Sequence, residues 1–302
     1  MGGATIGAGP PGASDRLLRR LEWQVLRRLD GRVQGAHRTL WRGVGIDVAD
    51  LREYTPEDDV RHIDWNVTAR LDEPYVRRYT EDRDLTAWLV LDRSASMRVG
   101  AAEHGKDTVL RDLAVCLARL FTGQGNPVGA VLFDNASQRI IPPRTGRTQA
   151  LRLAHEIGRA APPPGATTDL AAMLRLAATT ARRRSLVLVL SDFIGDPGWE
   201  RALAMLAHRH EVVAVRIVDP AELELPDLGL VLVEDAETGE QLMLDTGDPL
   251  LRQRFAEQAQ ARESGLDAAL RRGTAAAHRV TTDEDLVTAL IDMVWRTKRR
   301  RR

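Results

Sequence analysis

Three short polar segments, each beside a predicted strand or helix end, carry the side chains with the clearest chemistry. Asp92–Arg93–Ser94–Ala95–Ser96 follows an apolar run, Thr167–Thr168–Asp169 opens a helical pattern, and Asp192 follows a second apolar run. Two carboxylates and three hydroxyls from these segments are candidate ligands. Because the segments contain no His or Cys, they favour a hard cation, Mg²⁺ with Mn²⁺ or Ca²⁺ as alternatives, over Zn²⁺ or copper.

The elements that must position these side chains follow from the hydrophobic pattern. We expect strands at 85–91, 128–133, 139–141, 186–190, 212–218 and 279–281, and helices at 106–121, 148–159, 170–182, 198–209 and 249–271. Continuous apolar strands that alternate with helices are typical of a parallel sheet covered on both faces. Right-handed crossovers then predict a doubly wound, mostly parallel, Rossmann-like α/β sheet, whose ligand crevice lies where its strands end.

The remaining chain predicts smaller parts around this sheet. We expect a disordered N-terminus at 1–14, an N-terminal helix with a small extended module at 15–84, the main domain at 85–296 and a basic tail at 297–302. Within these parts, Trp65 is a predicted packing anchor. Residues 230–233 and 241–244 predict a hairpin appended to the sheet, and Thr282 or Asp283 is expected to cap a final helix.

Composition restricts the class of protein. Lys plus Arg equals Asp plus Glu at 43 each, which argues against a protein that mainly coats nucleic acid, and 43% hydrophobic residues favour a packed globular chain. The single cysteine, Cys116, lies in an apolar helical run, and we expect it to be buried. Neither a secretory pattern nor a transmembrane stretch is present, so a cytoplasmic location is expected.

The polar segments resemble those of von Willebrand factor A domains. Asp92–Arg93–Ser94–Ala95–Ser96 matches the family's DxSxS signature, while Thr168 and Asp192 match its second and third loops. The resemblance implies a metal-ion-dependent adhesion site. In that site Ser94, Ser96 and Thr168 contact the metal directly or nearly so, and Asp92 and Asp192 bind it directly or through water. Thr167 is the alternative to Thr168, and Asp169 is expected to be a charge at its helix start.

The region before the main domain resembles the DUF58 family, which places such a motif directly before a von Willebrand A-type domain. The resemblance lies in Leu51–Trp65, Thr68–Arg70, Asp235–Gly239 and Thr281–Leu286, with Glu57 where members usually have glycine. It implies a MoxR-type AAA+ ATPase as partner, in chaperone-like assembly or activation of an unknown client protein. The Arg and Asp residues of the motif are expected to form an internal ion-pair lattice, with a recognition surface as the alternative; they are Arg52, Asp58, Asp59, Arg61, Asp64 and Arg70.

Enzyme signatures are missing from the sequence. No Walker A loop or Gly-x-Ser-x-Gly elbow is present, and Ser94 stands where a haloacid-dehalogenase-type phosphotransferase has its second Asp. We therefore expect a non-enzymatic, metal-dependent protein-binding protein. The alternatives are a scaffold with a vestigial metal site and a metal-dependent hydrolase.

Overall fold

Two compact units divide the chain: Leu29–Leu85 forms the smaller unit, and Thr86–Arg302 belongs to the larger. The computed structural model describes residues 48–55, 60, 63, 65–71, 73–79, 86–98, 105–134, 137–159, 169–234, 240–274, 276–286, 288–290 and 293. The predicted N-terminal helix, the disordered N-terminus and the basic tail lie outside these residues. So does most of the predicted Arg–Asp lattice.

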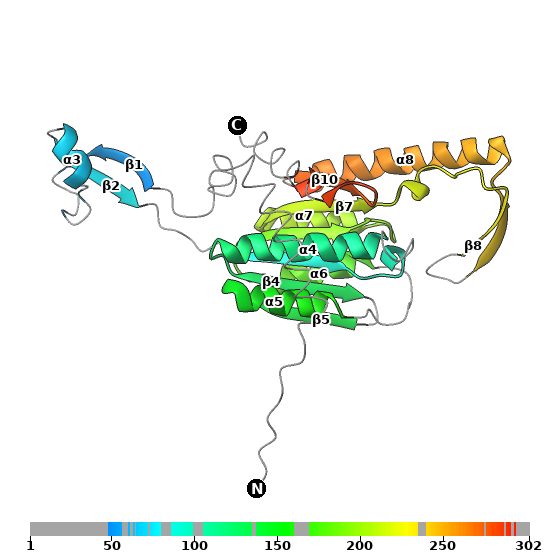
Figure 1. Ribbon diagram of the computed structural model, residues 1–302, viewed down its shortest axis with the longest axis horizontal. Coiled ribbons are helices and arrows are strands. Elements are labelled where there is room, and N and C mark those ends of the chain that lie inside the picture. The colour runs from blue at the N-terminus through cyan, green and yellow to red at the C-terminus, as the bar shows by residue number, and fades with distance from the viewer. Residues whose placement is uncertain are drawn as a thin grey trace, which may run out of the picture. The chain divides into compact units, whose positions relative to one another are not determined.

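The described part of the smaller unit contains an antiparallel strand pair and a short helix. Strand β1 (Val48–Glu53) pairs antiparallel with β2 (Tyr75–Tyr79), and α3 (Trp65–Leu71) lies between them in the chain (Figure 1). The hydroxyl of Thr68 accepts a hydrogen bond from the Tyr75 amide at 3.1 Å. Trp65 is 68% exposed, so its prediction as a packing anchor is wrong. It is the first residue of a seven-residue helix, and its side chain is left largely in solvent.

The larger unit is built on a six-stranded sheet with the strand order β10-β7-β6-β3-β4-β5. Its strands are β3 (Ala87–Asp92), β4 (Val128–Asp134), β5 (Ser137–Arg144), β6 (Leu186–Ser191), β7 (Glu211–Val218) and β10 (Ala276–Thr281). All neighbours run parallel except β4 and β5. The predicted mostly parallel α/β sheet is therefore confirmed. Antiparallel β5 forms an edge of the described sheet. Pro142 and Pro143, which lack an amide N–H, are tolerated there because the outer side of an edge strand needs no backbone donors.

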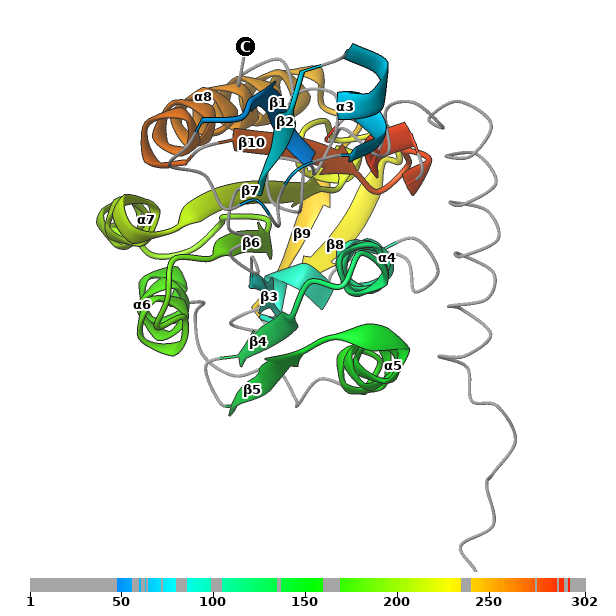
Figure 2. The same ribbon diagram turned by 90° about the vertical axis from the view of Figure 1, so that its left-hand side faces the viewer.

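Helices cover both faces of this sheet. They are α4 (Lys106–Gly123), α5 (Gly146–Ile157), α6 (Leu170–Thr180), α7 (Trp199–Arg209) and α8 (Pro249–Gly273). Helices α4 and α5 lie on one face and α6 and α7 on the other (Figure 2). Every residue of β3, β4 and β6 is buried, which explains their unbroken apolar runs. Cys116 on α4 is buried as predicted.

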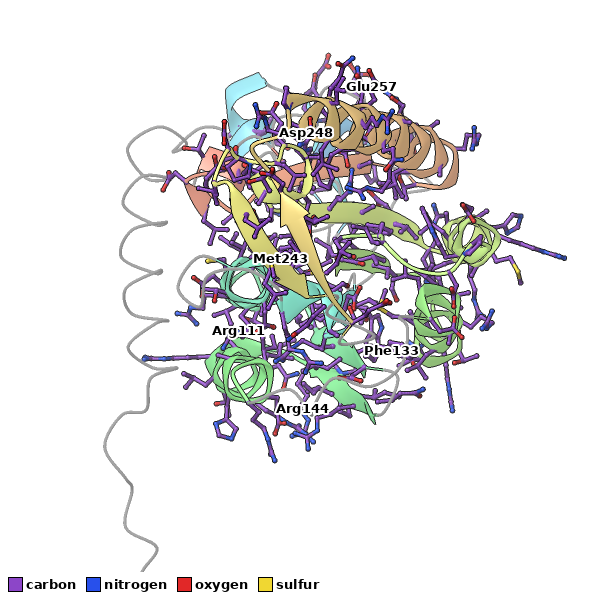
Figure 3. The ribbon with its side chains drawn as sticks, turned by 90° about the vertical axis from the view of Figure 1, so that its right-hand side faces the viewer. Arg111, Phe133, Arg144, Met243, Asp248 and Glu257 are labelled. Carbon is purple, nitrogen blue, oxygen red and sulfur yellow. The ribbon has the colours of Figure 1, made fainter. Side chains whose placement is uncertain are left out.

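The predicted hairpin forms, but not as part of the main sheet. Strands β8 (Leu230–Glu234) and β9 (Gln241–Asp245) pair only with each other among the described strands. The prediction of an appended hairpin is therefore wrong, because neither strand of the hairpin extends the β10 edge or the β5 edge of the six-stranded sheet. The hairpin leaves apolar side chains exposed, and Figure 3 labels one of them, Met243.

The described part of the C-terminal segment begins a helix at residue 286. The Asp285 carboxylate accepts hydrogen bonds from the amide and hydroxyl of Thr288, at 3.3 and 3.0 Å. Asp285, rather than the predicted Thr282 or Asp283, is thus the capping residue, because the chain completes a turn after β10 before the helix starts. Across the described residues, no helix combines the length and the apolar character that crossing a membrane requires.

Candidate metal centre

The strand order places two polar loops side by side. From β3 the chain moves outward to β4 and β5, and then returns to β6 on the other side of β3. The carboxyl ends of β3 and β6 therefore flank a topological switch point, where open α/β sheets form their ligand crevices. Asp92 ends β3 and Asp192 directly follows β6, so both predicted carboxylates lie at this point.

The loop after β3 folds back on its own aspartate. Asp92 is fully buried, and its Oδ1 accepts a hydrogen bond from the Ser94 amide at 3.0 Å. Its Oδ2 accepts from the Ser191 hydroxyl at 2.6 Å, which connects this loop with the end of β6. The hydroxyl oxygens of Ser94 and Ser96 are 3.0 Å apart. Three of the predicted site residues, Asp92, Ser94 and Ser96, are thus brought together in one turn.

Arg93 fixes the position of this turn. Its guanidinium donates hydrogen bonds to the carbonyl oxygens of Ile157 and Arg159 at 2.8 and 3.2 Å, at the end of α5. Its Nε lies 3.2 Å from Asp107 Oδ1 on α4, and its amide donates to the Phe133 carbonyl at 2.8 Å. Arg93 is only 4% exposed, so the arginine inside the DxSxS segment is a structural anchor.

The loop after β6 is held in an unusual backbone conformation. Phe193 has φ of 57°, in the left-handed region that non-glycine residues seldom adopt. The Phe193 amide donates a hydrogen bond to the Ser191 hydroxyl at 2.9 Å, and the Phe193 ring packs on that of Trp199 with ring centroids 5.4 Å apart. These contacts hold the turn that directs the buried Asp192 carboxylate. Asp192 Oδ1 accepts from the Ile194 amide at 3.0 Å.

The other oxygen of Asp192 is bound by a buried lysine. Lys106, the first residue of α4, is 1% exposed, and its Nζ lies 2.8 Å from Asp192 Oδ2. The same ammonium contacts Glu222, in the 3-10 helix η4 (Pro220–Glu222) after β7. Burial alone would lower the pKa of Lys106, but the charges and hydrogen bonds of Asp192 and Glu222 raise it above the ordinary value. Lys106 therefore stays protonated.

Asp92 contacts no lysine or arginine side chain among the described residues. Burial raises the pKa of Asp92 to about 6, and the charge of Asp192 adds to the increase, while hydrogen bonds from Ser191 and Ser94 reduce it only in part. Among the described residues, Lys106 is the one cationic side chain bonded to either aspartate. Two carboxylates and Glu222 therefore share one positive charge, and the shortage of positive charge fits a divalent cation beside Asp92.

The donor set is of the type that suits Mg²⁺. No group of three His, Cys, Asp or Glu side chains is arranged to hold a metal within the described part of the chain. The oxygens gathered here come from two aspartates and the paired serine hydroxyls, and Mg²⁺ is commonly held by few carboxylates and several waters. Thr167 and Thr168 lie outside the described residues. Asp169 caps α6 by accepting from the Ala172 amide at 2.7 Å, which confirms its predicted place at the helix start.

Sequence reasoning missed Lys106, Ser191 and Glu222. One signal was available for Lys106, because the chain has only two lysines, Lys106 and Lys298, among its 43 basic residues. A lysine at the start of a helix in an arginine-rich chain is a rare choice of residue and marks a position whose contacts matter. No comparable signal marked Glu222, which lies 116 residues from Lys106 in the chain.

Together the sheet order and the two loops define an α/β protein with an acidic, hydroxyl-bearing centre at a switch point. The sequence profile of the family described as "Protein of unknown function DUF58" matches residues 50–265. This chain belongs to the DUF58 family, as its motifs predicted.

Relatives and solved structures with similarity to this chain come from several organisms. Uncharacterized protein Rv1480 of Mycobacterium tuberculosis and uncharacterized protein Mb1516 of Mycobacterium bovis are each 38% identical over 287 residues, which cover 93% of this chain and 89% of theirs. The crystal structure of BatB from Bacteroides thetaiotaomicron aligns with a TM-score of 0.45 at 15% identity, over 71% of this chain and 99% of that one. The SpRpn10 VWA domain aligns with a TM-score of 0.39 at 14% identity, over 69% of this chain and 94% of that domain.

Proposed function

We propose that this chain is a non-enzymatic protein-binding protein whose binding centre holds a divalent cation, with Mg²⁺ as the first candidate. Asp92, Ser94, Ser96 and Asp192 would hold the ion, together with Thr168 or Thr167. The observation that carries the proposal is the uncompensated charge of Asp92, a fully buried carboxyl beside a second one at the switch point of the sheet. When bound, the ion would supply an open coordination position for an acidic side chain of a partner.

The residues of the chain have defined parts in this function. Arg93 holds the DxSxS turn against α5, and the Ser191 hydroxyl ties that turn to β6, so the donors keep their places before a partner arrives. Such preorganisation reduces the ordering cost of binding. Membership of DUF58 supports a MoxR-type AAA+ ATPase as the partner, with the pair acting on a client protein in chaperone-like assembly or activation.

Metal binding is tested by calorimetry and thermal unfolding with MgCl₂. We expect Mg²⁺ to release or absorb heat and to raise the Tm of the wild-type chain, because a ligand that binds only the folded state stabilises it. Asp92→Asn should lose both effects. Asp169→Asn is the matched control, because Asp169 is an exposed helix cap, and it should keep the effect of Mg²⁺. A wild-type chain that shows neither heat nor a change of Tm would contradict the metal centre.

Partner binding is tested by affinity purification from the native host. We expect a tagged wild-type chain to recover an AAA+ ATPase in Mg²⁺, with much less recovery in EDTA or with Asp92→Asn. Recovery of no ATPase under any of these conditions would count against the partnership.

One observation favours a second candidate, a scaffold whose metal site is vestigial. Lys106 compensates the charge of Asp192 from within the chain. The scaffold predicts that Asp92→Asn and EDTA leave partner recovery unchanged, which separates it from the metal-dependent function in the same purification.

A further inference from the structure

Building on the metal centre proposed above, we propose that Lys106 is a built-in cation that competes with the divalent ion for Asp192. In the structure Lys106 bridges Asp192 and Glu222. When the ion binds, Lys106 gives up Asp192 and keeps Glu222 as its partner. Lys106 and Glu222 together therefore set the metal affinity, and the site keeps its structure in both states.

The buried position of the Lys106 ammonium is unfavourable unless the carboxylates of Asp192 and Glu222 compensate its charge. It is the first residue of α4, where the helix dipole disfavours a cation. Its side chain is 1% exposed, and burying an ammonium is costly unless it is paired and hydrogen-bonded. Asp192, at 0% exposure, and Glu222, at 23%, supply that pairing from two different strand ends.

Lys106 and an ion would meet at the same carboxylate of Asp192. Asp192 Oδ1 already accepts a hydrogen bond from the Ile194 amide at 3.0 Å. Oδ2 is bound by Lys106 Nζ at 2.8 Å, so an ion that uses Asp192 meets the ammonium at the same carboxylate. Two cations at one carboxylate repel each other strongly in a buried site. This repulsion favours withdrawal of Lys106 from Asp192, while its existing contact with Glu222 is kept.

The choice of lysine supports an exchangeable partner. The other two buried cations among the described residues are arginines, Arg93 and Arg216. Arg93 binds two carbonyls, and Arg216 makes a two-pronged pair with Glu263. The planar guanidinium fixes such geometry, whereas an ammonium is a compact charge with three rotatable donors. A chain with two lysines in total places one of them here.

The first test measures Mg²⁺ affinity by calorimetry in three variants. Lys106→Met removes the competing charge and should lower the Kd by roughly tenfold or more, since charge repulsion in a buried site is large. Glu222→Gln removes the charge to which Lys106 withdraws and should raise the Kd several-fold. Glu224→Gln, a charge change at an exposed position two residues away, is the control and should leave the Kd unchanged.

The outcomes separate this proposal from the metal centre itself. If wild type binds Mg²⁺ and Lys106→Met binds it equally or more weakly, the competition is refuted and the metal centre stands. If neither wild type nor Lys106→Met binds Mg²⁺, both the metal centre and the competition are refuted. Glu222→Gln keeps Lys106 and Asp192 in place, so it provides an answer even where Lys106→Met does not fold.

The second test follows the lysine directly by NMR. Lysine labelled with ¹³C at Cε gives only two side-chain signals in this chain, from Lys106 and Lys298. Saturating Mg²⁺ should shift the Lys106 signal and leave that of Lys298 in place, with assignment by Lys298→Arg. A Lys106 signal that does not move while calorimetry records Mg²⁺ binding refutes the exchange.

Discussion

Asp92 is a fully buried carboxyl whose pKa, raised to about 6, exceeds its ordinary value of 3.8. The neutral form therefore predominates in the folded chain only below about pH 6. Because the folded-state pKa is raised, the stability that protonation contributes is complete below pH 3.8 and is lost as the pH rises through about 6. A bound cation reverses this preference, since it favours the ionised carboxylate.

The first prediction concerns this titration. In EDTA, the wild-type unfolding free energy should fall relative to that of Asp92→Asn by up to about 3 kcal/mol between pH 4 and pH 7, because one pKa unit corresponds to about 1.4 kcal/mol. Asparagine can accept from the Ser94 amide as the neutral acid does, but it does not ionise. Urea unfolding across this pH range measures the difference. Parallel curves for the two proteins would show that Asp92 does not titrate as argued.

At the scale of elements, an ion-pair network ties helix α8 to the site. Arg216 on β7 donates through Nε to the Asp192 carbonyl at 3.1 Å and through its terminal nitrogens to Glu263 on α8, one of them at 2.6 Å. Arg216 is 2% exposed. Burial alone would raise the pKa of Glu263, but the hydrogen bond and charge of Arg216 and the charges of Arg279 and Arg262 lower it. The network therefore holds the middle of α8 beside the loop that carries Asp192.

The second prediction tests this network. Glu263→Gln should lower the unfolding free energy at pH 7 by about 2 to 4 kcal/mol, because it leaves the buried Arg216 without its counter-charge. Since the folded pKa of Glu263 is lowered, the difference from wild type should shrink as the pH falls below 4.5.

Glu257→Gln on the same helix is the control for the second prediction. Glu257 pairs with Gln253 at an exposed position, and Figure 3 shows it on the outer side of α8. Its effect should stay within about 0.5 kcal/mol. An equal loss in both variants would mean that general charge on α8, and not the Arg216 pair, stabilises the helix.

The third prediction concerns the contact between β3 and β4. A Cβ at Gly129 would lie 2.8 Å from Trp88 Cζ3 and 3.0 Å from the Ile141 carbonyl oxygen, so Gly129→Ala should destabilise the fold by about 1 to 3 kcal/mol. Gly265, inside α8, has open space around its Cβ position, and Gly265→Ala should stabilise by about 0.5 to 1 kcal/mol. Denaturant unfolding measures the free energy of unfolding of both variants. A Gly129→Ala chain as stable as wild type would contradict the close packing between β3 and β4.

At the scale of the whole molecule, the described core and the described site residues lie in the larger unit. The six-stranded sheet, its helices and the residues from Asp92 to Glu222 all follow Thr86. Among the described residues, strands β1 and β2 form a two-stranded sheet of their own. The larger unit therefore has its own core, which is the requirement for independent folding.

The fourth prediction follows from this division. A fragment of residues 86–302 should unfold cooperatively and bind Mg²⁺ with the Kd of the full chain, because the described residues of the centre are all within it. Thermal unfolding and calorimetry on the fragment measure both properties. A fragment that unfolds without a cooperative transition would show that residues before Thr86 complete the core.

The sequence alone determined the strand and helix pattern, the parallel sheet and the gathering of Asp92, Ser94 and Ser96. Those features depend on hydrophobic periodicity and on contacts within a few residues, which a sequence displays directly. Only the tertiary structure decided that Lys106 reaches Asp192 and Glu222, that Asp285 caps the last helix, and that β8 and β9 stand apart from the main sheet. Lys106 and Glu222 are 116 residues apart, and no local pattern specifies which distant strand ends meet or which charges compensate each other once water is excluded.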